Sequence, residues 1–117
     1  MNNLKIYHNP RCSKSRKALK IIKDHDIEIT IVEYLEKPLE KSELENIFRL
    51  LNKRPKDLIR RNEIDFKKNN IKEIIENDAE IINAMLRFPK IIERPIVFSK
   101  SKAVIGRPPE NVLELIN

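Results

Sequence analysis

The fold of this chain is decided by residues 4–34, which read LKIYHNPRCSKSRKALKIIKDHDIEITIVEY. A short apolar run, Leu4–Tyr7, comes first, and apolar residues then recur at helical spacing from Ser13 to about Asp24. A second run, Ile29–Glu33, is rich in β-branched residues and reads as a strand. A strand, a helix and a strand in this order favour two parallel strands joined by the helix, with Ser13 placed to cap it.

The middle of the chain is helical in pattern. Helices are expected at Glu40–Leu51, Pro55–Ile59 and Asn77–Arg87, and the periodicity of residues 64–77 is weaker. Two short apolar runs, Ile96–Phe98 and Ala103–Ile105, look like a hairpin, and a proline pair then introduces a C-terminal helix. We therefore predict one α/β domain over residues 1–117, with strands at both ends and a helical insert at about 38–90. Gly106, the only glycine, is expected to supply a backbone conformation that other residues resist.

The composition narrows the class of protein. The 117 residues are 40% hydrophobic and 36% charged, with a formal net charge of +6. Because acidic residues are interleaved throughout, we expect a solvated mixed surface and no nucleic-acid partner, although small anions remain open as ligands. No apolar run has the length of a membrane span, and no segment reads as a signal peptide. A single unpaired cysteine suits the reducing cytosol, so we expect a cytoplasmic protein. We also expect a monomer with no membrane partner.

Cys12 is the only cysteine, so its meaning rests on its thiol. It lies at the expected helix start, with Arg11, Lys14 and Arg16 close in sequence. Helix-end amides and positive charge lower a cysteine pKa, which indicates a reactive thiolate rather than a buried hydrophobe. His8 lies four residues earlier: either a tight turn brings a protonated imidazole near the sulfur, or the histidine is an exposed loop residue.

Several known thiol mechanisms do not fit the spacing. A Cys-x5-Arg phosphatase loop would need arginine where Ala18 stands, and a Cys-x-x-Cys pair would need cysteine where Ser15 stands. No metal site is expected, because no cysteine and histidine set has zinc spacing.

Arginines near the expected strands are candidate anion ligands. Arg94 and Arg107 flank predicted strands, the usual place for site residues in open α/β folds. Spacing alone does not single out Arg60 from Arg61, Arg54 or Arg49. From the residues themselves, the sequence therefore indicates an anion-binding thiol site and does not name the anion.

Four motifs, in order, carry a family resemblance. They are Tyr7-His8-Asn9-Pro10-x-Cys12-x-x-Ser15-Arg16, Leu58-Ile59-Arg60, Glu93-Arg94-Pro95-Ile96-Val97 and Gly106-Arg107-Pro108. From about Leu4 to Ile116 the chain resembles the glutaredoxin-coupled arsenate reductase family. Arg11 beside Cys12, and the ending around Gly106, are similar to a less characterised arsenate-reductase-like branch. The resemblance implies a thioredoxin-like fold, a four-stranded mixed sheet with a helical insert after the second strand, and a cis bond before Pro95.

The resemblance also implies residue roles and partners. Cys12 would be the nucleophile and His8 would support its thiolate; the substrate-binding residues would be Ser15, Arg60, Arg94 and Arg107. The implied reaction reduces arsenate, or a similar oxyanion, through an arseno-cysteine adduct. Glutathione would be the co-substrate and glutaredoxin the next electron donor, with no bound cofactor.

Two other functions remain open at this stage. One is a general glutathione-dependent thiol oxidoreductase that acts on protein mixed disulfides. The other is an Spx-like regulator that binds RNA polymerase. Those regulators usually carry Cys-x-x-Cys, so Ser15 speaks against the second.

Overall fold

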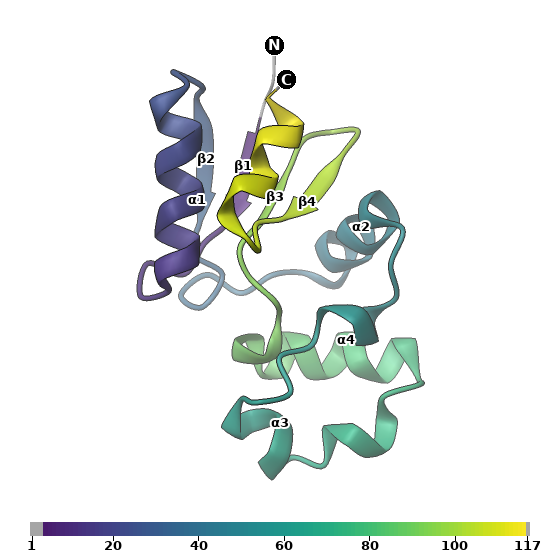
Figure 1. The fold of residues 1–117 in the computed structure, drawn as a ribbon. Helices are drawn as coiled ribbons and strands as arrows, with labels where there is room; N and C mark the ends of the chain where they lie inside the picture. The colour runs from purple at the N-terminus through teal and green to yellow at the C-terminus, as the bar shows by residue number, and fades with distance from the viewer. Residues whose placement is uncertain (1–3, 117) are drawn as a thin grey trace. The chain divides into compact units, whose positions relative to one another are not determined.

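A computed structural model describes residues 4–116, which form two compact units (Figure 1). The first unit is made of the chain up to Lys37 and from Arg94 onward, and the second is Pro38–Glu93. The second unit corresponds to the helical insert expected at about 38–90. That the two units together form one domain over residues 1–117 stays a prediction.

The first unit contains a four-stranded mixed sheet. Its strands are β1 (Leu4–Tyr7), β2 (Ile29–Val32), β3 (Ile96–Phe98) and β4 (Ala103–Ile105), in the order β2-β1-β3-β4. β1 pairs with β2 in parallel, whereas β3 runs antiparallel to both β1 and β4. The predicted mixed sheet is confirmed, but β2 ends at Val32 rather than Glu33. The carbonyl of Glu33 instead accepts the N–H groups of Glu36 and Lys37, which starts a turn.

Helix α1 (Ser13–Asp24) connects the two parallel strands, with the bounds that the periodicity predicted. The prediction that Ser13 caps this helix is wrong. Cys12 is the N-cap: its backbone is extended, and its carbonyl accepts the N–H of Arg16 at 3.0 Å. The chain therefore enters the helix at Cys12, which places the thiol beside the first free amides of α1.

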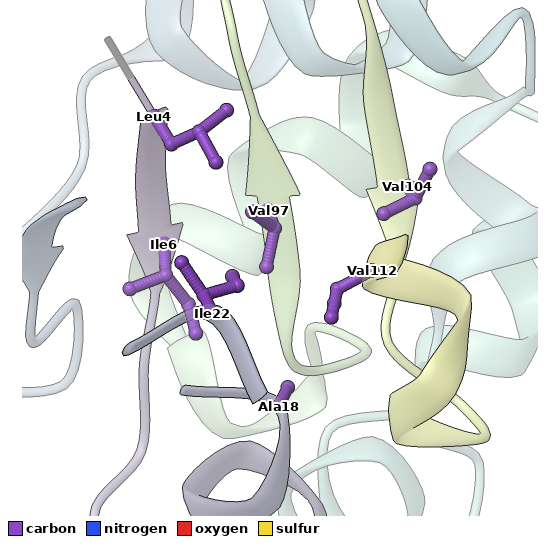
Figure 2. Close-up of a cluster of buried hydrophobic side chains, with 7 residues drawn as sticks. All are labelled: Leu4, Ile6, Ala18, Ile22, Val97, Val104 and Val112. Carbon is purple, nitrogen blue, oxygen red and sulfur yellow. The ribbon is translucent and has the colours of Figure 1, made fainter. Parts of the chain in front are cut away.

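One face of the sheet is buried under α1 and the C-terminal 3₁₀ helix η4 (Pro109–Leu115), which contact each other. Ile6, Val97 and Val104 lie opposite one another on three neighbouring strands. They belong to a buried cluster of seven side chains drawn in Figure 2: Leu4, Ile6, Ala18, Ile22, Val97, Val104 and Val112. Through Ala18 and Ile22, this core packs α1, the helix that Cys12 caps, against the sheet.

Gly106 follows β4, and the reason for a glycine there differs from the expected one. The backbone of Gly106 has no positive φ. A Cβ at this position would instead lie 2.8 Å from Cγ of Pro95 and 3.4 Å from Cβ of Ala18. Close packing, not a special backbone conformation, requires the glycine. The predicted cis bond between Arg94 and Pro95 is confirmed, and the bond between Arg107 and Pro108 is also cis.

The second unit is built of helices. They are α2 (Lys41–Leu51), η1 (Pro55–Leu58), α3 (Ile64–Lys68), η2 (Ile71–Ile74), α4 (Asp78–Arg87) and η3 (Pro89–Ile91). The weak pattern of residues 64–77 gives two short helices, because Asn70 adopts a left-handed backbone that interrupts them. Asn77 caps α4 as predicted, and its side chain accepts the N–H of Glu80 at 3.1 Å. Within residues 4–116, no helix is long and apolar enough to cross a membrane.

Candidate active site

The loop from β1 to α1 holds Cys12 in place through its own hydrogen bonds. The carbonyl of Asn9 accepts the N–H of Cys12 at 3.0 Å, and the Asn9 side chain accepts the N–H of Arg11 at 3.0 Å. The Arg16 guanidinium donates to the carbonyl of Pro10 at 2.8 Å. These contacts fix a tight turn in which the Cys12 thiol is partly buried. Asn9 received no role from the sequence, although an asparagine before proline is a recognised turn signal.

His8 and Ser15 form a buried pair beneath this turn. The Ser15 hydroxyl is fully buried, accepts the N–H of Asn9 at 3.1 Å and lies 2.7 Å from Nδ1 of His8. The Ser15 hydroxyl can donate to an unprotonated Nδ1, or accept from a protonated one, while it accepts from Asn9, so the contact accommodates either neutral tautomer of His8.

His8 carries its proton less readily than an ordinary histidine. Burial lowers the pKa of His8, with Arg16 and Lys23 adding to the effect and Glu33 opposing it. This lowered pKa disfavours the protonated imidazole, so it does not support the prediction that a protonated His8 favours the thiolate. The His8 side chain hydrogen-bonds to Ser15, so we expect His8 to affect Cys12 by holding the turn in place.

The Cys12 thiol has a lowered pKa. Burial opposes ionisation, but hydrogen bonds from the Ser15 and Lys14 backbone N–H groups and from the Arg94 side chain outweigh it. The charge of Arg94 adds to the lowering. These amides belong to the first turn of α1, so the helix start and one arginine together favour the thiolate.

Two arginines of the first unit converge on this sulfur. Nη2 of Arg107 lies 3.6 Å from Sγ of Cys12, and Nε of Arg107 donates to the carbonyl of Arg94 at 2.6 Å. Burial lowers the pKa of Arg94, but interactions with Cys12 and Tyr34 outweigh it, so this pKa is raised. Arg94 precedes β3 and Arg107 follows β4, and because these strands are antiparallel, both arginines lie at the same end of the hairpin.

Tyr34 is a site neighbour that the sequence reading did not assign. Its side chain is 1% exposed, interacts with Arg94, and packs its ring 6.5 Å from the ring of Tyr7. The only feature of the sequence that could have indicated a place for Tyr34 near the site is its position directly after the second strand.

Arg60 lies in the second unit, where it is paired with carboxylates. Its Nη1 lies 3.1 Å from Oε1 of Glu93, and its Nε lies 3.3 Å from Oε2 of Glu63. The role of Arg60 in a clamp around Cys12 stays a prediction.

Together, the described residues offer a nucleophile beside fixed positive charge. A thiolate with two guanidinium groups can attack the centre of a small oxyanion while the arginines bind its oxygens. Within residues 4–116, no group of three or more histidine, cysteine or acidic side chains is placed to hold a metal ion.

Comparisons with known proteins show which family and fold this chain shares. A family model described as the ArsC family matches residues 7–115. An arsenate reductase of Neisseria meningitidis is 40% identical, over 96% of this chain and 97% of its own length. The uncharacterised protein YfgD of Escherichia coli K12 is 42% identical, over 97% and 96% of the two chains.

A solved structure supports the same relation. The arsenate reductase from Vibrio cholerae superposes with a TM-score of 0.91 at 37% identity, over 97% of each chain. The predicted thioredoxin-like fold, with its mixed four-stranded sheet, is thereby confirmed.

Proposed function

The chain belongs to the ArsC family, and we propose that it reduces arsenate to arsenite through an adduct on Cys12, using glutathione and glutaredoxin as electron donors. The observation that carries this proposal is the placement of Arg94 and Arg107 against the Cys12 sulfur. A lone reactive thiol of this kind needs external thiols, which the cytosol provides, and we place the protein there.

The first step requires the arginines. A thiolate and an arsenate anion repel each other, and two guanidinium groups offset this repulsion while binding oxygens in a forked geometry. Cys12 Sγ attacks arsenic, a sulfur–arsenic bond forms, and one oxygen of arsenate takes a proton and leaves as water. Arg60 is proposed as a third ligand of the oxyanion. Ser15 acts by holding the turn, because its hydroxyl is buried and hydrogen-bonded inside the protein.

External thiols then supply both electrons. The sulfur of glutathione replaces a second arsenic-bound oxygen, which also leaves as water. A glutaredoxin thiolate attacks the glutathione sulfur, and the electron pair of the broken sulfur–arsenic bond stays on arsenic, which is reduced from As(V) to As(III). Glutaredoxin leaves as its mixed disulfide with glutathione. Water then displaces the Cys12 thiolate and releases arsenite, so one cysteine in the chain is sufficient.

The proposal is tested by arsenate-dependent oxidation of NADPH, coupled through glutathione reductase, glutathione and glutaredoxin. We expect turnover that requires both thiol donors and is abolished in Cys12→Ser. A wild-type protein that alkylates readily at Cys12 but shows no arsenate-dependent rate would contradict the proposal, because the thiol would then be active without this substrate.

A further inference from the structure

The positive charge of the chain is concentrated beside the active thiol. Residues 11–23 contain six cationic side chains and no acidic one, while the formal net charge of all 117 residues is also +6. The remainder of the chain is therefore neutral. All six side chains are exposed: Arg11, Lys14, Arg16, Lys17, Lys20 and Lys23. We call the five of them that belong to α1, from Lys14 to Lys23, the cationic face of α1.

Most of this charge does not stabilise the helix, since only Lys23 lies in the last turn, where a cation suits the helix dipole. Cations in the first turn, such as Lys14 and Arg16, oppose the helix dipole, and Lys20 repels like charges three or four residues away. Within residues 4–116, the only salt bridge recorded for this face joins Lys20 to Asp24, at 2.8 Å on the exposed surface. An exposed pair of this kind contributes little. Charge that disfavours local structure suggests a function for the surface.

Activation of the thiol does not account for the cationic face either. The lowering of the Cys12 pKa comes from the Ser15 and Lys14 amides and from Arg94, not from the lysine side chains of α1. An oxyanion bound at Cys12 is served by Arg94 and Arg107. The cationic face runs from Lys14 to Lys23, about 15 Å along α1 at 1.5 Å per residue. This length greatly exceeds a small anion and matches the scale of a protein surface.

We propose that the cationic face of α1 is the docking surface for the protein thiol that reduces the adduct on Cys12, and that this partner carries an acidic patch around its own reactive cysteine. The proposal rests on the proposed function, since it concerns the donor for the same site. Opposite charges steer two proteins toward each other and fix their register, which accelerates association at low ionic strength. Because Cys12 is the N-cap of α1, a partner bound along α1 can bring its own thiol to the sulfur at the helix start.

The docking step can be isolated with a stable disulfide. Oxidised glutathione converts the wild-type protein to the Cys12–glutathione mixed disulfide, which places a glutathione sulfur on Cys12. A glutaredoxin thiolate attacks that sulfur, the disulfide bond breaks, Cys12 leaves as a thiolate, and the glutathione is transferred to glutaredoxin. Stopped-flow measurement gives the second-order rate constant for a glutaredoxin of net negative charge and for one of net positive charge. Neutral dithiothreitol serves as a donor that needs no docking.

Two charge-reversal variants form a matched pair. Lys17→Glu/Lys20→Glu changes the cationic face of α1, and Lys100→Glu/Lys102→Glu changes two exposed lysines by the same net charge. The second pair lies in the turn between β3 and β4, at the opposite end of the hairpin from Arg94 and Arg107. Reduction by dithiothreitol checks that Cys12 remains equally reactive in both variants.

We expect the acidic glutaredoxin to react faster than the basic one with wild type, at a rate that falls steeply with added salt. The α1 variant should lose about 10-fold or more of this rate at low salt, within the range of electrostatic steering, and most of its salt dependence. The control variant and all rates with dithiothreitol should stay near wild type.

Equal rates for the two variants with the acidic glutaredoxin would overturn the docking surface, as would failure of both glutaredoxins to react. If the α1 variant instead loses only binding of a duplex DNA probe, the cationic face serves nucleic acid and the proposal is wrong. Charge-dependent transfer without arsenate turnover would leave the docking surface standing and contradict the proposed function. Arsenate turnover that does not depend on the α1 charges would contradict the docking surface and leave the proposed function standing.

Discussion

Removal of the Arg107 side chain tests the clamp most directly. Arg107→Ala deletes the guanidinium whose Nη2 lies 3.6 Å from Cys12 Sγ and whose Nε holds the Arg94 carbonyl at 2.6 Å. Two unit charges 4 Å apart interact by about 1 kcal/mol in water and about 4 kcal/mol at an effective dielectric constant near 20. Because Cys12 and Arg107 are both partly buried, we expect Arg107→Ala to remove about 2 kcal/mol of electrostatic stabilisation from the reacting site. This corresponds to a fall of about 30-fold in kcat/KM for arsenate.

The assay is steady-state arsenate reduction with saturating glutathione and glutaredoxin, alongside iodoacetamide alkylation of Cys12 below its pKa. Arg107→Lys should recover only part of the activity, because one ammonium cannot reach both the sulfur and the Arg94 carbonyl as a planar fork does. Arg87→Ala is the matched control: Arg87 is an exposed arginine of α4, 5.2 Å from the Phe88 ring centroid. Equal kcat/KM values and alkylation rates for Arg107→Ala and Arg87→Ala would refute the clamp.

Three further predictions concern the support of the site. Ser15→Ala removes the partner of the buried His8 Nδ1 and Asn9 N–H groups and should lower the free energy of unfolding by about 1–3 kcal/mol, measured by urea denaturation; an unchanged midpoint would show that this pair does not hold the turn. Because burial lowers the pKa of His8 below 6.5, the unfolded chain takes up its proton first, so stability should be full above about pH 6.5 and fall on acidification toward the folded-state pKa, by at most about 1.4 kcal/mol per pH unit. His8→Gln should remove that component of the pH dependence, and identical slopes in the two proteins would contradict a buried neutral imidazole. Gly106→Ala would place a Cβ 2.8 Å from Cγ of Pro95 and should cost about 1–3 kcal/mol, seen as a lower Tm, whereas an unchanged Tm would mean that Pro95 yields without cost.

The sequence by itself determined the parts of the fold that depend on short-range pattern. The bounds of α1 and of three strands follow from the spacing of apolar residues over a few positions. The cap of α4 by Asn77 depends on residues three apart, so it too could be read from the chain. The position of the thiol at a helix start could also be read from the sequence, because β1, the turn with Cys12 and α1 follow one another directly along the chain. The weaker pattern of residues 64–77 did not reveal the left-handed Asn70 that divides it.

Only the tertiary structure decided what surrounds that thiol. Cys12 and Arg107 are 95 positions apart, and strand pairing, not spacing, brings Arg107 and Arg94 to the sulfur. The pKa of His8 is lowered because the folded chain buries its side chain, and the neighbouring residues in the sequence do not reveal that burial. Gly106 is required by the closeness of Pro95, which no local rule for glycine predicts. Burial and convergence are properties of chain segments packed in space, so they exist only once the sheet and its covering helices have formed.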